Sequence, residues 1–173
     1  MMNADKSQAI AIRLYVRTDA PALASLIRVS VRQIASRDYT AAQIQAWAPP
    51  DDIDEKRFGE KRASRPTWVA EVQGRIAGFT DLEPDGHVDM LYVHPDFERR
   101  GVARALLKQV EEVARATAVP RLYTEASITA RPVFEAMGFR IIGPQKVTVR
   151  GVSMTNYRME KWLDSSATMP RSI

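Results

Sequence analysis

The sequence of 173 residues contains no cysteine. This absence excludes disulfide bridges, thiolate metal sites and any mechanism in which a cysteine carries an acyl group, and we expect no bound metal. Runs of eighteen apolar residues are also missing, as is a basic segment followed by an apolar one near Met1, so neither a membrane span nor an export signal is predicted. We therefore expect a cytoplasmic protein with no membrane partner.

Clustered positive charge is equally scarce. The net charge is only +4, and lysines and arginines are spread along the chain apart from small groups such as Arg99 and Arg100. No nucleic-acid partner is therefore expected, although the basic pI of about 9.6 leaves a weaker alternative, a nucleic-acid or anion-binding protein. The ordinary globular composition and the absence of a linker predict one domain at 10–163, between a flexible N-terminus at 1–9 and a flexible tail at 164–173.

Hydrophobic periodicity predicts a protein in which strands and helices are mixed. The expected strands are 10–16, 68–72, 76–79, 87–94, 121–126 and two more around the Arg150–Gly151 turn. The expected helices are 19–37, a short one from Thr40 to before Pro49, 51–63, 102–117 and 129–137, the last ending at Gly138. Strand, helix and strand follow one another from 87 to 126, which predicts an α/β (α+β) fold.

The segment from Leu91 to Leu107 carries the clearest functional signal. A strand ends at Val93, and a loop containing Gly101 opens directly into a helix. Backbone N–H groups at such a helix start bind phosphate or pyrophosphate, and an anion would also relieve the unfavourable arginines in the loop and first turn, Arg99, Arg100 and Arg104. The alternative is a solvated helix start whose dipole Glu98 satisfies.

The residues Glu98-Arg99-Arg100-Gly101-Val102-Ala103 resemble the phosphate loop of the GCN5-related N-acetyltransferase (GNAT) family, [Gln/Arg]-x-x-Gly-x-[Gly/Ala], and depart from it at Glu98. Phe134 to Phe139 resembles the family's Tyr-Glu-x-x-Gly-Phe helix end, and Ile12-Arg13 with Asp19 resembles its start. The resemblance implies a mostly antiparallel, twisted sheet of six to seven strands flanked by helices. It also implies a splayed acetyl-CoA cleft between strands 4 and 5.

Acetyl-CoA as cosubstrate and an amine as acceptor are likewise implied by the resemblance. The pantetheine arm is expected to pair with Leu91, Tyr92 and Val93, and the Val93 N–H is expected to hold the developing oxyanion. The pyrophosphate is expected at the loop and the first helical turn, formed by Arg99, Arg100, Gly101, Val102, Ala103 and Arg104.

A general base must take the proton of the attacking amine. Counting back from Gly101, His87 lies where histone-acetylating members of the family carry their glutamate base, and Asp89 would face the same side of a regular strand. His87 is equally well explained as a solvated residue after the Pro84-Asp85-Gly86 turn, and Asp89 as a residue that orients it. Glu83 is a third candidate, and His94 is interpreted as a turn residue.

Phe134 aligns with the tyrosine that protonates the CoA thiolate in the family, and phenylalanine donates no proton. A thiolate with a pKa of roughly 8.5 leaves without full protonation, and Tyr123 or water are possible substitutes. Ser127 is expected either to bind pantetheine or to cap the next helix, and Arg131 either to reach a CoA phosphate or to lie in solvent.

Tyr39 and Trp47 lie in the region that usually forms one wall of the acceptor pocket in the family, where they either bind substrate or pack in the core. The leading hypothesis is thus an enzyme that acetylates a primary amine. Its alternative is a CoA-binding module without turnover, motivated by Glu98 and Phe134. A homodimer is expected from base rates alone.

Overall fold

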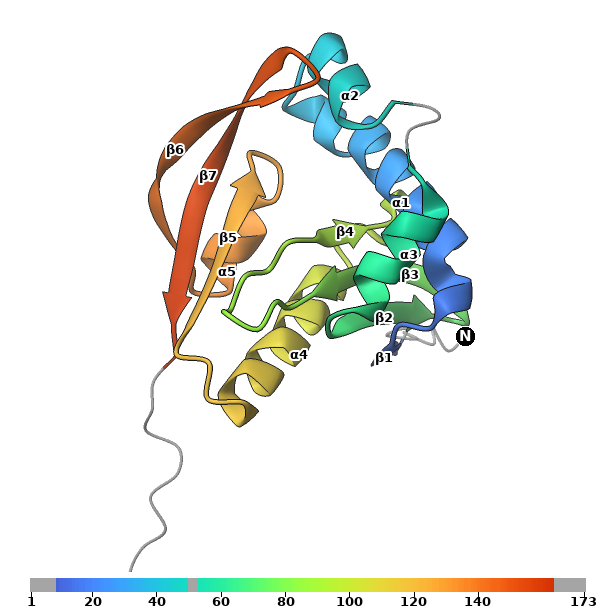
Figure 1. The fold of residues 1–173 in the computed structure, drawn as a ribbon, viewed down its shortest axis with the longest axis vertical. Coiled ribbons are helices and arrows are strands. Elements are labelled where there is room, and N and C mark those ends of the chain that lie inside the picture. The colour runs from blue at the N-terminus through green and yellow to red at the C-terminus, as the bar shows by residue number, and fades with distance from the viewer. Residues whose placement is uncertain (1–8, 50–52, 164–173) are drawn as a thin grey trace, which may run out of the picture.

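The computed structural model describes residues 9–49 and 53–163. The flexible ends predicted at 1–9 and 164–173 lie outside these residues, except for Ala9. Seven strands and the helices between them form one α/β unit (Figure 1). Within the described ranges no helix combines the length and the apolar character that crossing a membrane requires.

The strands form two hydrogen-bonded sets. The first is antiparallel in the order β1-β2-β3-β4, and the second is antiparallel in the order β5-β7-β6. Their bounds are Ile10–Leu14 for β1, Thr67–Val72 for β2, Arg75–Asp81 for β3, Leu91–Val93 for β4, Arg121–Ser127 for β5, Arg140–Val149 for β6 and Val152–Trp162 for β7. The two sets are joined by a single parallel bridge, His87 with Tyr123, so the predicted mixed, mostly antiparallel sheet is confirmed but splits into two parts.

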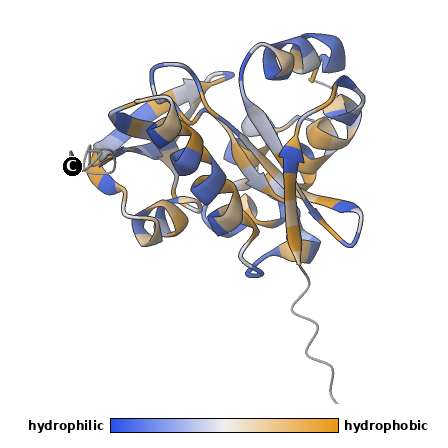
Figure 2. Ribbon diagram, turned by 90° about the horizontal axis from the view of Figure 1, so that it is seen from below, coloured by the Kyte–Doolittle hydropathy of each residue, from blue (hydrophilic) through white to orange (hydrophobic). Residues whose placement is uncertain are grey.

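Helices cover both faces of the first set, with α1 on one face and α4 on the other, whereas α2 and α5 contact strands of the second set. The bounds of the helices are Ala20–Gln33 for α1, Ala41–Trp47 for α2, Glu55–Ala63 for α3, Val102–Ala116 for α4 and Arg131–Ala136 for α5. Neighbouring residues of β2 point to opposite faces, so Val69 packs in the core with Leu23 of α1, while Ala70 packs in the core with Leu106 of α4. Burial on both faces explains the nearly continuous apolar run in β2. Figure 2 shows hydrophilic and hydrophobic residues alternating along the helices.

Several local predictions are confirmed. Thr40 and Gln43 form the expected capping box at the start of α2, and Gly138, which follows the C-cap residue Met137 of α5, has a φ of +86°. Arg150 and Gly151, with φ values of +46° and +78°, form the turn between β6 and β7. Positive φ at both central residues is the geometry that matches the twist of a hairpin.

Other boundaries were wrong. The helix expected to run to Arg37 ends at Gln33, and a 3-10 turn follows at Ala35–Arg37. The helix expected at 51–63 begins at Glu55, because the Asp54 side chain accepts the N–H of Arg57 and caps it there, and 51–52 lie outside the described residues. The helix expected from Thr129 begins at Arg131. The first strand ends at Leu14 instead of Val16.

The strand expected at 87–94 is short, since only Leu91–Val93 is β4. The side chain of Asp81 is the reason. Its Oδ1 accepts the N–H groups of Asp89 at 3.0 Å and Met90 at 2.9 Å, which would otherwise seek a neighbouring strand. His87 and Asp89 consequently do not lie on one regular strand, and the prediction that their side chains share a face by alternation has no basis here.

Candidate acetyl-transfer site

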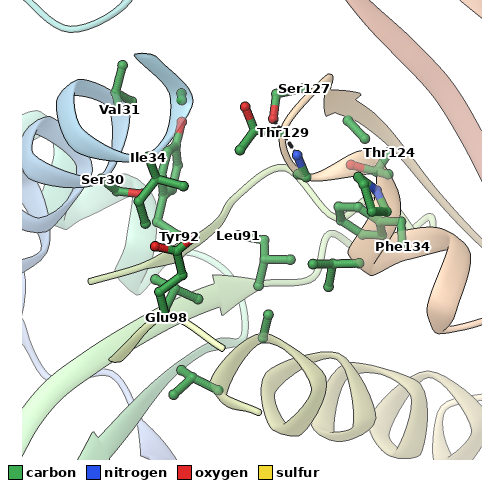
Figure 3. Close-up of a pocket in the computed structure, with 18 of the residues that line it drawn as sticks. Ser30, Val31, Ile34, Leu91, Tyr92, Glu98, Thr124, Ser127, Thr129 and Phe134 are labelled. Carbon is green, nitrogen blue, oxygen red and sulfur yellow. Dashed lines mark hydrogen bonds between the residues drawn. The ribbon is translucent and has the colours of Figure 1, made fainter. Parts of the chain in front are cut away.

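A cleft of about 630 Å³ opens where the two halves of the sheet part. At one end the halves are still joined, because the Val88 N–H donates to the Tyr123 carbonyl at 2.9 Å and the Tyr123 N–H donates to the Gly86 carbonyl at 3.0 Å. Farther along, β4 and β5 are the edge strands of separate sets. In Figure 3, Leu91 lies between a wall with Ile34 and Tyr92 and a wall with Ser127, Thr129 and Phe134.

Two N–H groups of β4 face this cleft. The His94 N–H donates to the Ala77 carbonyl of β3. In an antiparallel ladder, the N–H groups of every second residue point to the same neighbouring strand, and those of the residues between them point away from it. The N–H groups of Leu91 and Val93 therefore point away from β3, toward β5. Since β4 is an edge strand, these groups have no ladder partner and are available to a molecule bound in the cleft.

The loop before α4 provides a second set of unpaired donors. Arg99 and Gly101 have φ values of +60° and +83°, which turn the chain sharply into α4, and no side chain caps that helix. Among the described residues, no side chain therefore caps the first-turn N–H groups, which an α-helix leaves without a partner of its own. A Cβ atom added to Gly101 would have only the Ile10 Cδ1, at 3.9 Å, within reach, so the space above this glycine is open. The arrangement fits a phosphate or pyrophosphate.

The arginines near this loop separate into two groups. Arg99 and Arg104 line the cleft, and neither forms an ion pair within the described part of the chain. The guanidinium of Arg100 instead lies 5.6 Å from the centroid of the Phe97 ring and does not line the cleft. Val102 and Ala103 line the cleft as expected.

Glu98 does not satisfy the α4 dipole, which was the alternative explanation of the loop. Its carboxylate receives two hydrogen bonds from Arg37, at 2.5 and 2.9 Å, and the hydrogen bond from Arg37 holds the pKa of Glu98 below its ordinary value. Both side chains line the cleft. The carboxylate that departs from the family pattern is thus charged and paired.

His87 is enclosed by two carboxylates. Its Nε2 lies 2.6 Å from Glu125 Oε2 and its Nδ1 lies 3.3 Å from Glu83 Oε2, while its ring stacks on Tyr123 with centroids 4.8 Å apart. Burial lowers the pKa of His87, but the hydrogen bond and charge of Glu125, and then those of Glu83, outweigh this effect and raise it. With both nitrogens engaged and no surface in the cleft, His87 is poorly placed as a base.

Asp89 and Glu125 do line the cleft. The Asp89 carboxylate lies 3.5 to 3.6 Å from three cationic side chains, those of Lys61, Arg62 and Arg65. Glu125, in the middle of β5, was not predicted as a site residue. The alternation of side chains along a strand does not by itself say which residues of β5 face the cleft between β4 and β5. Both carboxylates of this part of the cleft are therefore paired, Glu125 with His87 at 2.6 Å, whereas Arg99 and Arg104 at the α4 end form no ion pair within the described residues.

The comparisons with known proteins agree with this geometry. A model of the acetyltransferase (GNAT) domain matches residues 35–161. The chain belongs to the GNAT family. It is 39% identical over 150 residues to the uncharacterized N-acetyltransferase YafP of Escherichia coli K12, which covers 87% of this chain and 94% of YafP. It is accordingly an enzyme of the N-acetyltransferase class.

Solved structures show the same GNAT fold. A GCN5-related N-acetyltransferase from Rhodopseudomonas palustris superposes with a TM-score of 0.85 at 33% identity, covering 90% of this chain and 98% of that one. The PaiA N-acetyltransferase of Thermoplasma acidophilum, solved with coenzyme A, superposes with a TM-score of 0.73 at 16% identity, covering 90% and 99%. The mixed α/β fold, with antiparallel strands flanked by helices, is thus shared with GNAT enzymes of solved structure.

Phe134, which the sequence resemblance aligns with the tyrosine acid of the family, lines the cleft and packs edge-on against Phe139 with centroids 5.0 Å apart. Tyr123 is poorly placed to supply such an acid. Its hydroxyl donates to Asp85, and this hydrogen bond is the main cause that raises the pKa of Tyr123 to about 12. Tyr123 also lies outside the cleft lining.

Three further predicted residues serve structural contacts. Ser127 lines the cleft, and its Oγ accepts the Ala130 N–H at 3.0 Å before α5. Arg131 does not line the cleft, because its guanidinium lies over the Tyr157 ring, 4.8 Å from the centroid. His94 caps a short 3-10 turn through its Nδ1, which accepts the Asp96 N–H at 3.1 Å, in keeping with its interpretation as a turn residue.

Tyr39 and Trp47 have different positions. Tyr39 is buried and does not line the cleft, and its hydroxyl donates to the Thr155 carbonyl at 2.7 Å and accepts the Ile128 N–H at 2.9 Å. Tyr39 therefore connects the segment after α1 to β7 and to the end of β5. This position matches the interpretation that Tyr39 packs in the core. Trp47 packs edge-on against Tyr39 and lines the cleft.

Proposed function

We propose that this GNAT enzyme binds acetyl-CoA between β4 and β5 and transfers the acetyl group directly to a primary amine. The observation that carries the proposal is that one cleft combines the outward N–H groups of Leu91 and Val93 with the uncapped start of α4. The first set matches an extended amide-containing arm, and the second matches a pyrophosphate. The coenzyme A complex of the PaiA relative supports this occupant.

The residues present suit direct transfer. The bound cosubstrate supplies an acetyl thioester, and the Val93 N–H donates to the oxygen that becomes negative when the amine attacks. Without cysteine the chain has no thiol to carry the acetyl group itself, which favours direct attack. Because Phe134 donates no proton, the thiolate leaves unprotonated or takes a proton from water.

Asp89 is the general base in this proposal. Its carboxylate lines the cleft, so it accepts the amine proton directly or through one water, whereas His87 has no surface there. His87 instead acts as a positioning residue, because it holds Glu125 at 2.6 Å.

The test is release of CoA from acetyl-CoA in the presence of a panel of primary amines, with a protein amine included. We expect acceptor-dependent release, and a loss of about 10² to 10⁴ in rate for Asp89→Asn. Asp96→Asn is the matched control, since Asp96 is an exposed carboxylate outside the cleft lining. Binding of acetyl-CoA without release under any amine would favour the alternative, a CoA-binding module without turnover.

A further inference from the structure

The carboxylate of Glu98 poses an electrostatic problem for the proposed function. It occupies the first position of the phosphate loop, where the family pattern has glutamine or arginine, and it lines the same cleft as Gly101. A fixed negative charge beside an anionic ligand weakens binding unless another charge neutralises it. The loop therefore needs a compensating cation that the family pattern does not supply.

Arg37 is that cation, and it comes from a distant segment. It lies in the 3-10 turn after α1, 61 residues before Glu98, and both of its Nη atoms donate to the Glu98 carboxylate, at 2.5 and 2.9 Å. Two parallel hydrogen bonds of this kind fix the orientation of both groups. The Glu98 carboxylate is thereby held toward Arg37 and does not cap α4, whose first-turn N–H groups lack a side-chain partner.

The same segment contacts the other wall of the cleft. Asp38 accepts a hydrogen bond from the Thr129 hydroxyl at 2.8 Å, and the neighbouring Tyr39 hydroxyl accepts the Ile128 N–H. Figure 3 shows Glu98 and Thr129 on opposite sides of the cleft. The contacts of Asp38 with Thr129 and of Tyr39 with Ile128 therefore fix the backbone next to Arg37. From this backbone the guanidinium of Arg37 reaches Glu98 in the phosphate loop.

We infer that Arg37 is a positioning residue for the cosubstrate, which neutralises Glu98 and turns it away from the phosphates of acetyl-CoA. The inference rests on the proposed function. A direct contact between Arg37 and a phosphate would be a different role, because Arg37 would then be needed whether or not position 98 is charged. The two roles differ in what happens when both side chains are changed together.

The experiment measures acetyl-CoA affinity by calorimetry for Arg37→Ala, Glu98→Gln and the double variant. Arg37→Ala is expected to bind about tenfold more weakly, on the order of what one unneutralised charge near the phosphates costs in partly solvated surroundings. Glu98→Gln alone is expected to bind no more weakly than wild type. Adding Glu98→Gln to Arg37→Ala is expected to restore the affinity to within about twofold, and the loss in Arg37→Ala should shrink in high salt.

Arg75→Ala is the matched control. Arg75 forms a similarly exposed ion pair with Asp96 at 2.7 Å and does not line the cleft, so its loss removes the same net charge without affecting Glu98. Both pairs are exposed, so none of these variants should unfold the protein. Equal weakening in Arg37→Ala and the double variant would overturn the inference, as would an unchanged affinity in Arg37→Ala. Failure of folded wild-type protein to bind acetyl-CoA would overturn the proposed function itself.

Discussion

Replacing Val93 by proline isolates one backbone group in the cleft. The substitution removes the Val93 N–H, which faces away from β3, and leaves the β3–β4 ladder with all its hydrogen bonds. Proline is tolerated on edge strands where the missing N–H has no ladder partner, and β4 is an edge strand. Because no ladder hydrogen bond, each worth about 1 kcal/mol, is lost, the free energy of unfolding should fall by less than about 2 kcal/mol.

The catalytic loss should be larger than the structural one. Removing a single donor to a developing oxyanion costs about 10² to 10³ in kcat, or about 2.7 to 4 kcal/mol of transition-state stabilisation. We expect Val93→Pro to show this loss in saturating acetyl-CoA, with the amine that gives the fastest CoA release. Acetyl-CoA affinity, measured by calorimetry, should change by less than about tenfold, because the Val93 N–H is assigned to the oxyanion of the transition state and not to the bound ground state.

Leu91→Pro is the matched control, since its N–H faces the same side of the same strand. We expect it to weaken acetyl-CoA binding while kcat at saturation stays within about tenfold of wild type. The assignment of the oxyanion donor would be refuted if folded Val93→Pro kept kcat within about threefold of wild type. Equal losses of kcat in the two variants would refute it as well.

Three other predictions concern charges near the cleft. The pKa of His87 is raised in the folded protein above 6.5, the pKa of histidine in the unfolded chain. The stabilising contribution of His87 is therefore present below pH 6.5 and is lost as the pH rises through the pKa of the folded state. In His87→Gln, the free energy of unfolding measured with urea should no longer fall over this pH range. Arg62→Met should cost about 3 to 5 kcal/mol in urea unfolding, because the fully buried Asp81 carboxylate loses its buried partner at 2.6 Å and keeps only the more distant Arg65 at 3.6 Å. A cost below about 1 kcal/mol would contradict this. Tyr123→Phe should keep kcat within about threefold of wild type, because the Tyr123 hydroxyl is hydrogen-bonded to Asp85 and Tyr123 does not line the cleft. A loss of about 10² in kcat would instead indicate that Tyr123 protonates the leaving CoA thiolate.

Local chemistry made much of the fold predictable. The Thr40 capping box, the stop at Gly138 and the Arg150–Gly151 turn depend on neighbouring residues, and each lies where the sequence predicts it. The α4 start at Gly101 was predictable for the same reason, since a glycine of positive φ and the first helical turn belong to one segment.

Pairings between distant segments were not predictable. The Asp81 side chain shortens β4 by accepting the N–H groups of Asp89 and Met90, and no pattern within 87–94 indicates that competition. Glu125 meets His87 across 38 residues, which places a candidate base between two carboxylates. Such contacts follow from how the two halves of the sheet come together, which residue periodicity does not encode.

The most direct test is a calorimetric titration of the protein with acetyl-CoA, compared between wild type, Gly101→Glu and Gly74→Glu. Both glycines have positive φ, +83° and +73°, so the two substitutions strain the backbone alike, and a Cβ at Gly74 meets nothing within 4 Å. Only Gly101→Glu places bulk and negative charge at the start of α4. We predict that wild type and Gly74→Glu bind acetyl-CoA and that Gly101→Glu does not. Absence of binding by folded wild type, or equal binding by Gly101→Glu, would contradict the assignment of this cleft.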